Sequence, residues 1–419
     1  MMLTIVVFLL SACTKERDLP VQTETVATIR VAFNDESQFD RDFGHAFRFY
    51  HPDVMIRLVR RPDIVAMTST QIMNYLENDQ PDILILDRME YEILSQEGLL
   101  TNLYDFVVAS KMKLDDFLEP VIEMLRLDAG GNLNGLTPYF RSNVLYYNKD
   151  LFDQYDIPYP ESHTTWEQVM DTAREFALRG SVENGHYGLY HLIGDNPFIL
   201  MNIMSESENL SYINADQQIE LMNTRIHEFY KMVIEGMRIG AIAPPEDHET
   251  FAELFREGRA AMRYNGYHEL MDMHMFAQDF DVGVAAEPTH DGLSTSYVSE
   301  TIFAIPLNST NKEAAWKLIK FVLGEEFYQL KTRSFIDYGL PAEKKAFDQY
   351  LDTTLDKSAF YKNSPIKYSD RKKLLPVPVG GFLSVTKQWS REAAAGNISI
   401  DDSLQAIEQE LNSRLAGSP

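Results

Sequence analysis

Short apolar runs and helical stripes alternate along the N-terminal part of the chain. Residues 29–33 and 55–59 have the composition of strands, and apolar residues recur at helical spacing over 39–50 between them. A short helix around 70–78 leads to 81–87, a continuous apolar run that is typical of a strand covered on both faces. This order of strands and helices predicts a parallel, doubly wound sheet.

Polar residues follow the first and third of these strands. Asn34 and Asp35 come after the first strand, and Asp87 and Arg88 come after the third. Ligands of doubly wound sheets bind outside the carboxyl ends of the strands, so these residues are candidate ligand contacts. Asp87 has an alternative role, because an Asp between a strand and a helix often caps the helix.

The stretch from Gly135 to Phe176 combines a turn, a strand and a helix. The turn is at 137–139, and the β-branched and aromatic residues of 144–149 favour a strand. Thr164 and Glu167 have the spacing of a capping box, and apolar residues follow at helical spacing. The sequence therefore predicts a helix that begins at Thr164 and turns one apolar stripe toward a core.

The rest of the chain continues this alternation. Residues 187–190 fit a short strand, and 226–234 carry a helical stripe. Gly258 is expected to end a helix with positive φ before another strand. Thr310 and Glu313 form a second possible capping box, at the start of a helix over 315–322.

The N-terminus has the pattern of an export signal. Residues 1–10 are too short an apolar run to span a bilayer, and a polar segment follows. Leu10-Ser11-Ala12-Cys13 looks like a bacterial lipobox, and Cys13 is the single cysteine, so no disulfide is expected. No Lys or Arg precedes the apolar run, which departs from the usual signal. We therefore expect a signal peptide over 1–12, and a flexible tether over 13–28 lipidated at Cys13.

Composition narrows the function classes. A chain of 419 residues with 45% hydrophobic residues can fill two cores, and its net charge of −25 argues against a nucleic-acid partner. The motifs of serine hydrolases, P-loop proteins and zinc proteases are missing. The sequence neighbours His268 and His274, like His186 and His191, lack supporting ligands at metal spacing, so we interpret them as surface or core residues and expect no metal or cofactor.

Several segments resemble the family 1 extracellular solute-binding proteins, to which maltose-binding protein is related. The best match is LYYNKDLF at 145–152, followed by IPYP at 157–160 and TWE at 165–167. Further matches, in the family's order, are 81–103, 251–262, 297–306 and 315–322. The resemblance covers nearly the whole chain after the tether and implies the two-lobed, periplasmic-binding-protein-like α/β fold of type II. Each lobe would hold a doubly wound, mainly parallel sheet, and crossover strands would form the hinge.

The resemblance also implies lobe boundaries. Residues 29–138 and 300–345 would form the first lobe, and residues 139–299 and 346–419 would form the second. The helical segments 382–389 and 403–415 would then pack on the second lobe.

The expected function is that of a substrate-binding lipoprotein which captures a carbohydrate between its lobes and delivers it to an ABC permease. It would act as a monomer, anchored outside the cytoplasm by lipid alone. The candidate ligand contacts are Asn34, Asp35, Asp87, Arg88, Tyr139, Arg141, Tyr264, Tyr267, Glu300 and Phe382. Tyr139 and Arg141, at the first crossover, are the strongest of these. In relatives an aromatic ring near Tyr264 or Tyr267 often meets the sugar, although core packing is the alternative role of both.

Other functions stay open at this point. Arg88 and Arg141 suggest a charged oligosaccharide or another polar nutrient as an alternative ligand. A lipoprotein that presents its ligand to a sensor kinase is an alternative of another class. A carbohydrate-cleaving enzyme is the third alternative, and the sequence favours it least because no pair of carboxylates stands out.

Overall fold

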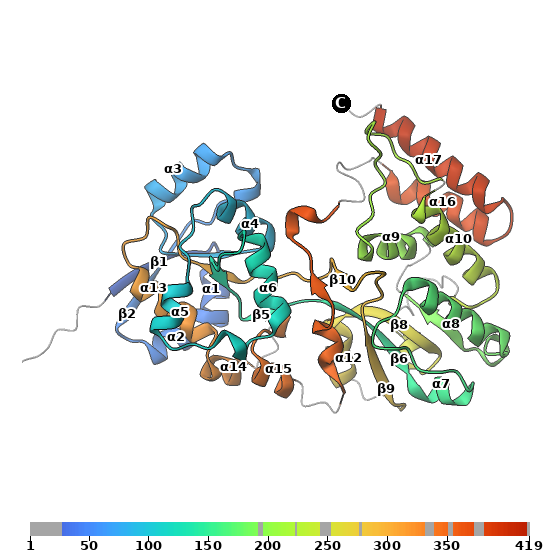
Figure 1. Ribbon diagram of the computed structural model, residues 1–419, viewed down its shortest axis with the longest axis horizontal. Helices are drawn as coiled ribbons and strands as arrows, with labels where there is room; N and C mark the ends of the chain where they lie inside the picture. Colours follow the sequence, from blue (N-terminus) through green and yellow to red (C-terminus); the bar gives the residue numbers. More distant parts are fainter. Residues whose placement is uncertain are drawn as a thin grey trace, which may run out of the picture.

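The computed structural model describes residues 27–191, 196–222, 224–243, 253–275, 279–331, 339–350, 355–372 and 381–416. Figure 1 shows two lobes side by side, joined by extended segments. The predicted two-lobed α/β architecture is confirmed. The signal peptide, Cys13 and most of the tether lie outside the described residues, and the tether was predicted to end too late, because the first strand already begins at Ala27.

The first lobe contains a five-stranded sheet. Its order is β2 (Val54–Val59), β1 (Ala27–Ala32), β3 (Ile83–Leu86), β11 (Ile302–Ala304) and β4 (Gly135–Leu136). β1 pairs in parallel with β2 and β3, as the sequence predicts. β11 arrives from the other lobe and pairs antiparallel with β3 and β4.

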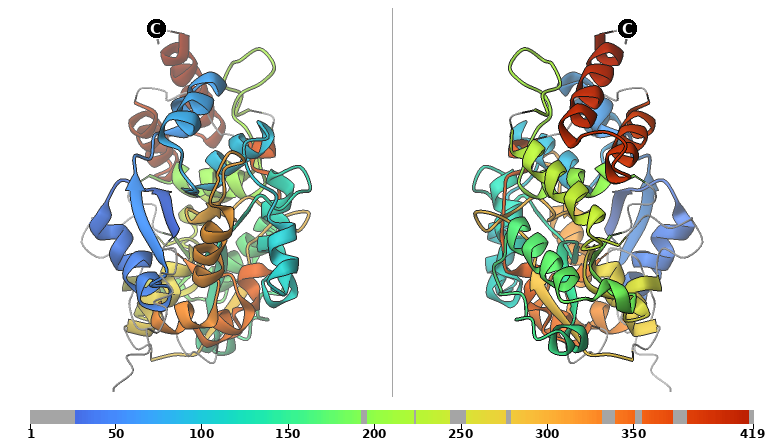
Figure 2. Two further views of the ribbon diagram at one scale, coloured as in Figure 1. Left: turned by 90° about the vertical axis from the view of Figure 1, so that its left-hand side faces the viewer. Right: turned by 90° about the vertical axis from the view of Figure 1, so that its right-hand side faces the viewer.

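Helices cover both faces of this sheet (Figure 2). They are α1 (Glu36–Phe39), a π-helix (Asp40–Gly44), α2 (His45–Tyr50), α3 (Ser69–Asp79), α4 (Arg88–Gln96), α5 (Tyr104–Ala109), α6 (Glu119–Asp128), α13 (Lys312–Val322), α14 (Glu325–Lys331) and α15 (Lys344–Gln349). The second predicted capping box is wrong. Asn311 precedes α13, and its side-chain amide bonds Asp82 instead of capping the helix, so tertiary contacts outweigh the local motif.

The second lobe contains a four-stranded sheet in the order β7 (Tyr187–Tyr190), β8 (Ala260–Gly266), β6 (Asn143–Asn148) and β9 (Val282–Ala286). Only β7 and β8 pair in parallel, whereas β6 is antiparallel to both its neighbours. The expectation of mainly parallel pairing therefore does not hold for this sheet. β6 enters from the other lobe, so no local helical crossover fixes its direction.

The helices of this lobe carry the predicted stripes. They are α7 (Lys149–Gln154), α8 (Trp166–Leu178), α9 (Phe198–Ser207), α10 (Arg225–Arg238), α11 (Glu253–Arg256), α12 (Tyr267–Met275), α16 (Phe382–Ala394) and α17 (Ile400–Ala416). Apolar residues of α16 and α17 pack on the second-lobe core, as expected. Gly258 has φ of 72° between α11 and β8, which confirms its predicted role.

The helix predicted to begin at Thr164 begins two residues later. Its capping box joins Thr165 to Gln168, not Thr164 to Glu167. Two consecutive threonines each have a suitable partner three residues on, so the local sequence fits either register. Trp166 is the first residue of α8, and its fully buried ring is consistent with the later start of the helix.

Extended segments connect the lobes. β5 (Tyr139–Phe140) pairs with β12 (Leu340–Pro341), and Arg141 forms a bridge with Val298. The hydroxyl oxygens of Thr137 and Ser299 lie 2.8 Å apart beside this bridge. β10 (Leu293–Ser294) pairs with β13 (Ser364–Pro365) near α6. The lobe boundaries stay predictions. Those between 138 and 139 and between 299 and 300 lie next to these contacts.

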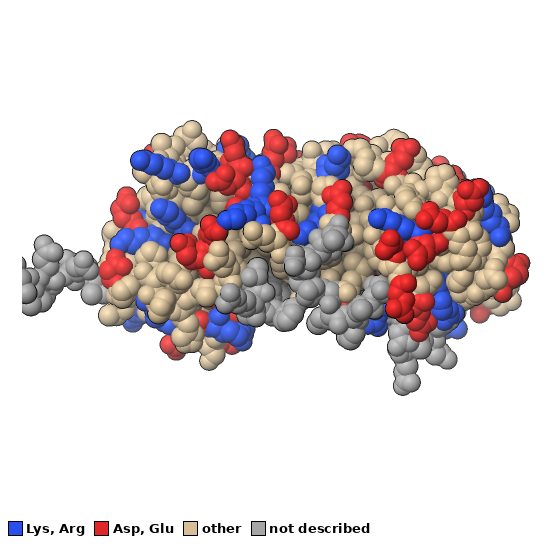
Figure 3. Space-filling view, turned by 90° about the horizontal axis from the view of Figure 1, so that it is seen from below, with Lys and Arg blue, Asp and Glu red and all other residues tan. Residues whose placement is uncertain are grey.

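Among the residues that the structure describes, no helix has both the length and the apolar character needed to cross a membrane. On the face seen in Figure 3, basic and acidic side chains are interspersed over both lobes. The negative net charge is therefore not collected into one patch on that face.

Candidate functional site

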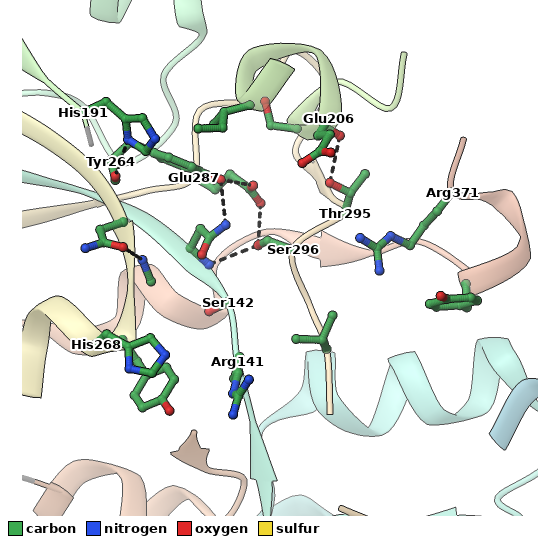
Figure 4. A pocket seen from close by; sticks show the side chains of 18 of the residues that line it. Arg141, Ser142, His191, Glu206, Tyr264, His268, Glu287, Thr295, Ser296 and Arg371 are labelled. Atoms are coloured by element: carbon green, nitrogen blue, oxygen red, sulfur yellow. Dashed lines mark hydrogen bonds between the residues drawn. The ribbon is translucent and has the colours of Figure 1, made fainter. Parts of the chain in front are cut away.

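A cavity of about 740 Å³ lies where the second lobe meets the connecting segments (Figure 4). We call it the junction cavity. Most of the residues that line it carry a polar or charged group; the lining consists of Arg141, Ser142, Asn143, His191, Ile203, Glu206, Ser207, Tyr264, Asn265, Gly266, Tyr267, His268, Glu287, Thr295, Ser296, Val298, Tyr368, Arg371 and Lys372.

Several elements converge on this cavity. The chain between β5 and β6 supplies Arg141, and the end of β8 with the start of α12 supplies 264–268. The last turn of α9 supplies Glu206. The segment 368–372 enters from the C-terminal part of the chain. The cavity is thus built from residues far apart in the sequence.

Glu287 anchors a buried network of hydroxyl groups. Its Oε1 accepts a hydrogen bond from the Tyr264 hydroxyl at 2.6 Å, and its Oε2 accepts from the Ser296 hydroxyl at 2.8 Å and from Ser294. Burial raises the pKa of the Glu287 carboxyl, although these hydrogen bonds act in the opposite direction. Both carboxylate oxygens are engaged, so Glu287 shapes the wall of the cavity.

His191 and Tyr264 are joined at the opposite side of this network. The Nδ1 atom of His191 lies 3.2 Å from the carbonyl oxygen of Tyr264. Desolvation lowers the pKa of His191 to about 4, so this imidazole is neutral at pH 7. The Tyr264 ring makes an edge contact with Trp166.

The charged side chains of the cavity are of both signs. Arg141 pairs with Glu300 at 3.3 Å and lies over the Tyr267 ring. Arg371 lies over the Tyr368 ring, 5.4 Å from its centroid. Glu206 is accessible from the cavity, and partial desolvation raises the pKa of its carboxyl. The arrangement suits a polar ligand with many hydrogen-bonding groups.

Three of the predicted contacts line the cavity, namely Arg141, Tyr264 and Tyr267. Glu300 adjoins it through its ion pair with Arg141. Tyr264 and Tyr267 are 4% and 1% exposed, so little of either ring is open to the cavity. Ligand binding by all these residues stays a prediction.

The other predicted contacts lie outside the cavity lining. In the first lobe, Asn34 bonds the backbone of Arg61, and Asp35 caps α1. Asp87 caps α4 in a complete capping box, which is the alternative role considered from the sequence.

Arg88, Tyr139 and Phe382 are also turned to structural contacts. Arg88 is buried in an ion pair with Asp128. Tyr139 is buried against Tyr328, and Phe382 packs on Phe198.

Sequence reasoning missed Glu206, Glu287 and Arg371, and it interpreted His191 and His268 as surface or core residues. Glu287 follows β9 directly, a position that could have drawn attention to it. The remaining residues carry no local signal, because tertiary folding alone brings them together. Within the described ranges, no group of three or more His, Cys, Asp or Glu residues could hold a metal ion.

Comparison with known proteins indicates the family and supports the fold. Residues 64–329 match the family model described as bacterial extracellular solute-binding protein. A binding protein of Brucella abortus (strain 2308) is 26% identical over 253 residues, which are 59% of this chain and 58% of that protein. The chain thus matches somewhat over half the length of the first curated relatives.

Two further relatives extend over more of the chain. The galactooligosaccharide-binding protein of Bacillus subtilis (strain 168) is 21% identical over 339 residues, which are 80% of this chain and 77% of that protein. The crystal structure of a sugar transporter from Rhizobium etli, in an open conformation, has a TM-score of 0.56 at 20% identity. It covers 92% of this chain and 99% of its own, and it supports the two-lobed fold.

Proposed function

This chain belongs to the bacterial extracellular solute-binding proteins, and we propose that it captures a carbohydrate in the junction cavity for delivery to an ABC permease. Proteins of this family act outside the cytoplasm. The proposal depends chiefly on the cavity itself, whose volume of about 740 Å³ and polar lining suit a saccharide. Amide and hydroxyl groups can match sugar hydroxyls, and a relative that binds galactooligosaccharides supports this class of ligand.

Binding is proposed to involve closure of the first lobe over the cavity. The lining comes from the second lobe and the connecting segments, so a ligand there would leave one side open for the first lobe. The paired segments β5 with β12 and Arg141 with Val298 would act as the hinge. A ligand favours closure only through contacts that improve in the closed state.

We propose that the protein binds its ligand without chemical change. The cavity contains two carboxylates, Glu206 and Glu287, as a glycosidase would require. Glu287 accepts hydrogen bonds at both oxygens from protein hydroxyl groups, which leaves it poorly placed to attack a sugar. Recovery of the saccharide unchanged after long incubation would support this view.

We further propose that the chain is a monomeric lipoprotein, exported and lipidated at Cys13. The lipobox-like sequence and the position of the single cysteine support lipidation. Labelled fatty acid should be incorporated by cells that express the chain and should be lost in Cys13→Ser. Equal labelling of both forms would contradict the proposal.

The binding function is tested by a thermal-shift screen of the purified protein against neutral sugars, sugar alcohols, uronates, amino acids and peptides. A ligand at about 100 times its dissociation constant should stabilise the fold by roughly 2.7 kcal/mol. The expected result is a shift confined to one saccharide series, which Arg141→Ala weakens while the unliganded melting temperature is kept. A shift with amino acids or peptides alone would overturn the carbohydrate assignment.

A further inference from the structure

We propose that the ligand is an anionic saccharide, whose acid group binds the Arg371 guanidinium in the junction cavity. This inference rests on the proposed carbohydrate-binding function and names the chemical class of its ligand. It starts from the charges that surround the cavity and from the partners that each of them has.

Arg371 is a half-buried cation that makes no direct ion pair among the described residues. Its guanidinium makes no ion pair or side-chain hydrogen bond with any residue that the structure describes, and its one close partner is the Tyr368 ring. Figure 4 shows this side chain extending into the cavity. Removing a guanidinium partly from water costs free energy that a nearby anion would offset. An anionic group of the ligand would supply that anion.

Neighbouring arginines already have carboxylate partners. Arg88 lies on the Tyr368 ring as well, yet it is neutralised by Asp128 at 2.6 Å. Arg141 pairs with Glu300. Arg371 therefore differs from the guanidinium groups beside it, because it has a ring contact and no direct carboxylate contact among the described residues.

The acidic residues of the cavity act on Arg371 without contacting it: burial lowers the pKa of its guanidinium, and the carboxylates of Glu206 and Glu287 oppose that effect. Glu287 is engaged by three hydroxyl groups, and neither it nor Glu206 forms an ion pair with Arg371 among the described residues. Lys372 adds a further positive charge to the same wall. Arg371 and Lys372 thus place two consecutive cations on this wall of the cavity, in a chain with a net charge of −25.

The segment that carries Arg371 is held at both ends. The backbone N–H of Tyr368 donates to Asp128 of the first lobe at 2.8 Å, and that of Lys372 donates to Asn209 of the second lobe at 2.6 Å. The Asn209 side chain also donates to the carbonyl of Asp370. These bonds fix the backbone on either side of Arg371, so binding an anion requires little further ordering.

The guanidinium geometry indicates which acid groups suit the site. Arg presents parallel N–H donors that match a carboxylate or an ester of sulfate or phosphate. A uronic acid carries the first group on a sugar ring, and a sulfated sugar carries the second. Asn143 and Asn265 each use one amide N–H inside the protein, toward the Tyr264 hydroxyl and toward Glu269, and the second N–H of each is proposed to meet a sugar hydroxyl.

Calorimetry with matched pairs of ligands tests the inference. Oligomers of galacturonate, glucuronate and mannuronate are compared with the neutral oligomers of the same sugars and with their sulfate esters. We expect at least one acidic oligomer to bind about 10-fold or more tightly than its neutral partner. The affinity should fall with added salt, because the contact is between charges. Whether carboxylate or sulfate is preferred identifies the acid group.

Two variants locate the contact. Arg371→Gln should remove most of the preference for the acid, so that the acidic and the neutral partner bind with similar affinity. Arg371→Lys should keep part of that preference. Arg174→Gln, which alters a second-lobe arginine outside the cavity lining, is the matched control and should change neither affinity.

The outcomes separate this inference from the proposed function. Neutral oligomers that bind as tightly as the acidic ones would overturn the inference and leave carbohydrate capture standing. A preference for acids that persists in Arg371→Gln would overturn the assignment to Arg371. Binding of no saccharide at all would overturn both proposals.

Discussion

Arg88 and Asp128 form a buried, bidentate ion pair between two helices of the first lobe. Nε and Nη2 of Arg88 lie 2.6 and 3.0 Å from the two carboxylate oxygens, and the side chains are 2% and 0% exposed. Arg88 also donates to the carbonyl of Tyr297 at 2.8 Å and to that of Ile366. The Arg88 guanidinium of the first lobe thus holds two segments that lead to the junction cavity.

Replacement of Arg88 by Met should therefore destabilise the protein strongly. The variant leaves Asp128 buried without its cation, and it leaves the carbonyls of Tyr297 and Ile366 without a donor. The expected loss is about 3–5 kcal/mol in the free energy of unfolding, measured by urea denaturation.

The matched control is Lys231→Ala, which removes an exposed pair with Glu235 and should cost at most about 0.5 kcal/mol. The double variant Arg88→Met/Asp128→Leu should recover part of the loss, because no unpaired charge remains. A loss in Arg88→Met no larger than in the control would show that the buried pair does not hold the junction.

How far the sequence could predict this molecule is visible at Arg88 itself. The apolar run before it predicted β3, and the position after that strand made it a ligand candidate. Its actual partner, Asp128, lies on another helix, and nothing in either segment indicates the other. Periodic patterns are local and fixed the elements well, whereas side-chain pairing depends on tertiary packing.

The same limit applies to the candidate site. Arg141 could be predicted as a ligand contact because it lies at the first crossover between the lobes, a position that the family resemblance identifies. Arg371 lies in a short polar stretch without periodicity, and it reaches the cavity only because Asp128 and Asn209 hold its backbone there. The direction of the β6 pairings was likewise set by the path between lobes.

Acid should destabilise the protein partly through His191. Its pKa is about 4 in the fold and about 6.5 in an unfolded chain, so the unfolded state binds the proton more readily. The stabilisation is complete above about pH 6.5 and is lost as the pH falls toward 4. Because His191 is partly exposed, we expect its protonation to lower the free energy of unfolding by about 1–2 kcal/mol at pH 5.

The variant His191→Asn isolates this contribution, since an amide can still donate to the Tyr264 carbonyl. Urea midpoints at pH 7 and pH 5 should differ less for this variant than for the parent protein. His45→Asn, at a side chain that is 76% exposed, should keep the parental difference. An unchanged difference in His191→Asn would mean that other groups cause the acid sensitivity.

Gly188 in β7 should tolerate no side chain. A Cβ atom there would lie 2.5 Å from both the Cα and the carbonyl oxygen of Ala173, on the helix α8 that packs over the strand. Backbone atoms cannot yield as a flexible side chain does, so Gly188→Ala should cost about 1–3 kcal/mol or more. Gly324→Ala, whose nearest contact would be 3.3 Å, is the control. Equal urea midpoints for the two variants would show that α8 can shift without cost.

Phe382 is a predicted ligand contact whose role can be tested against that of Arg141. The sequence made it a candidate ligand contact, but its ring packs on Phe198 with centroids 5.8 Å apart, outside the cavity lining. Phe382→Leu should therefore lower stability by about 1 kcal/mol and leave the affinity for the identified ligand unchanged. Arg141→Ala alters a residue of the cavity, so it should lower the affinity for the ligand and leave the stability unchanged. Calorimetry and urea denaturation of both variants separate the roles, and a large loss of affinity in Phe382→Leu would mean that the ligand reaches α16.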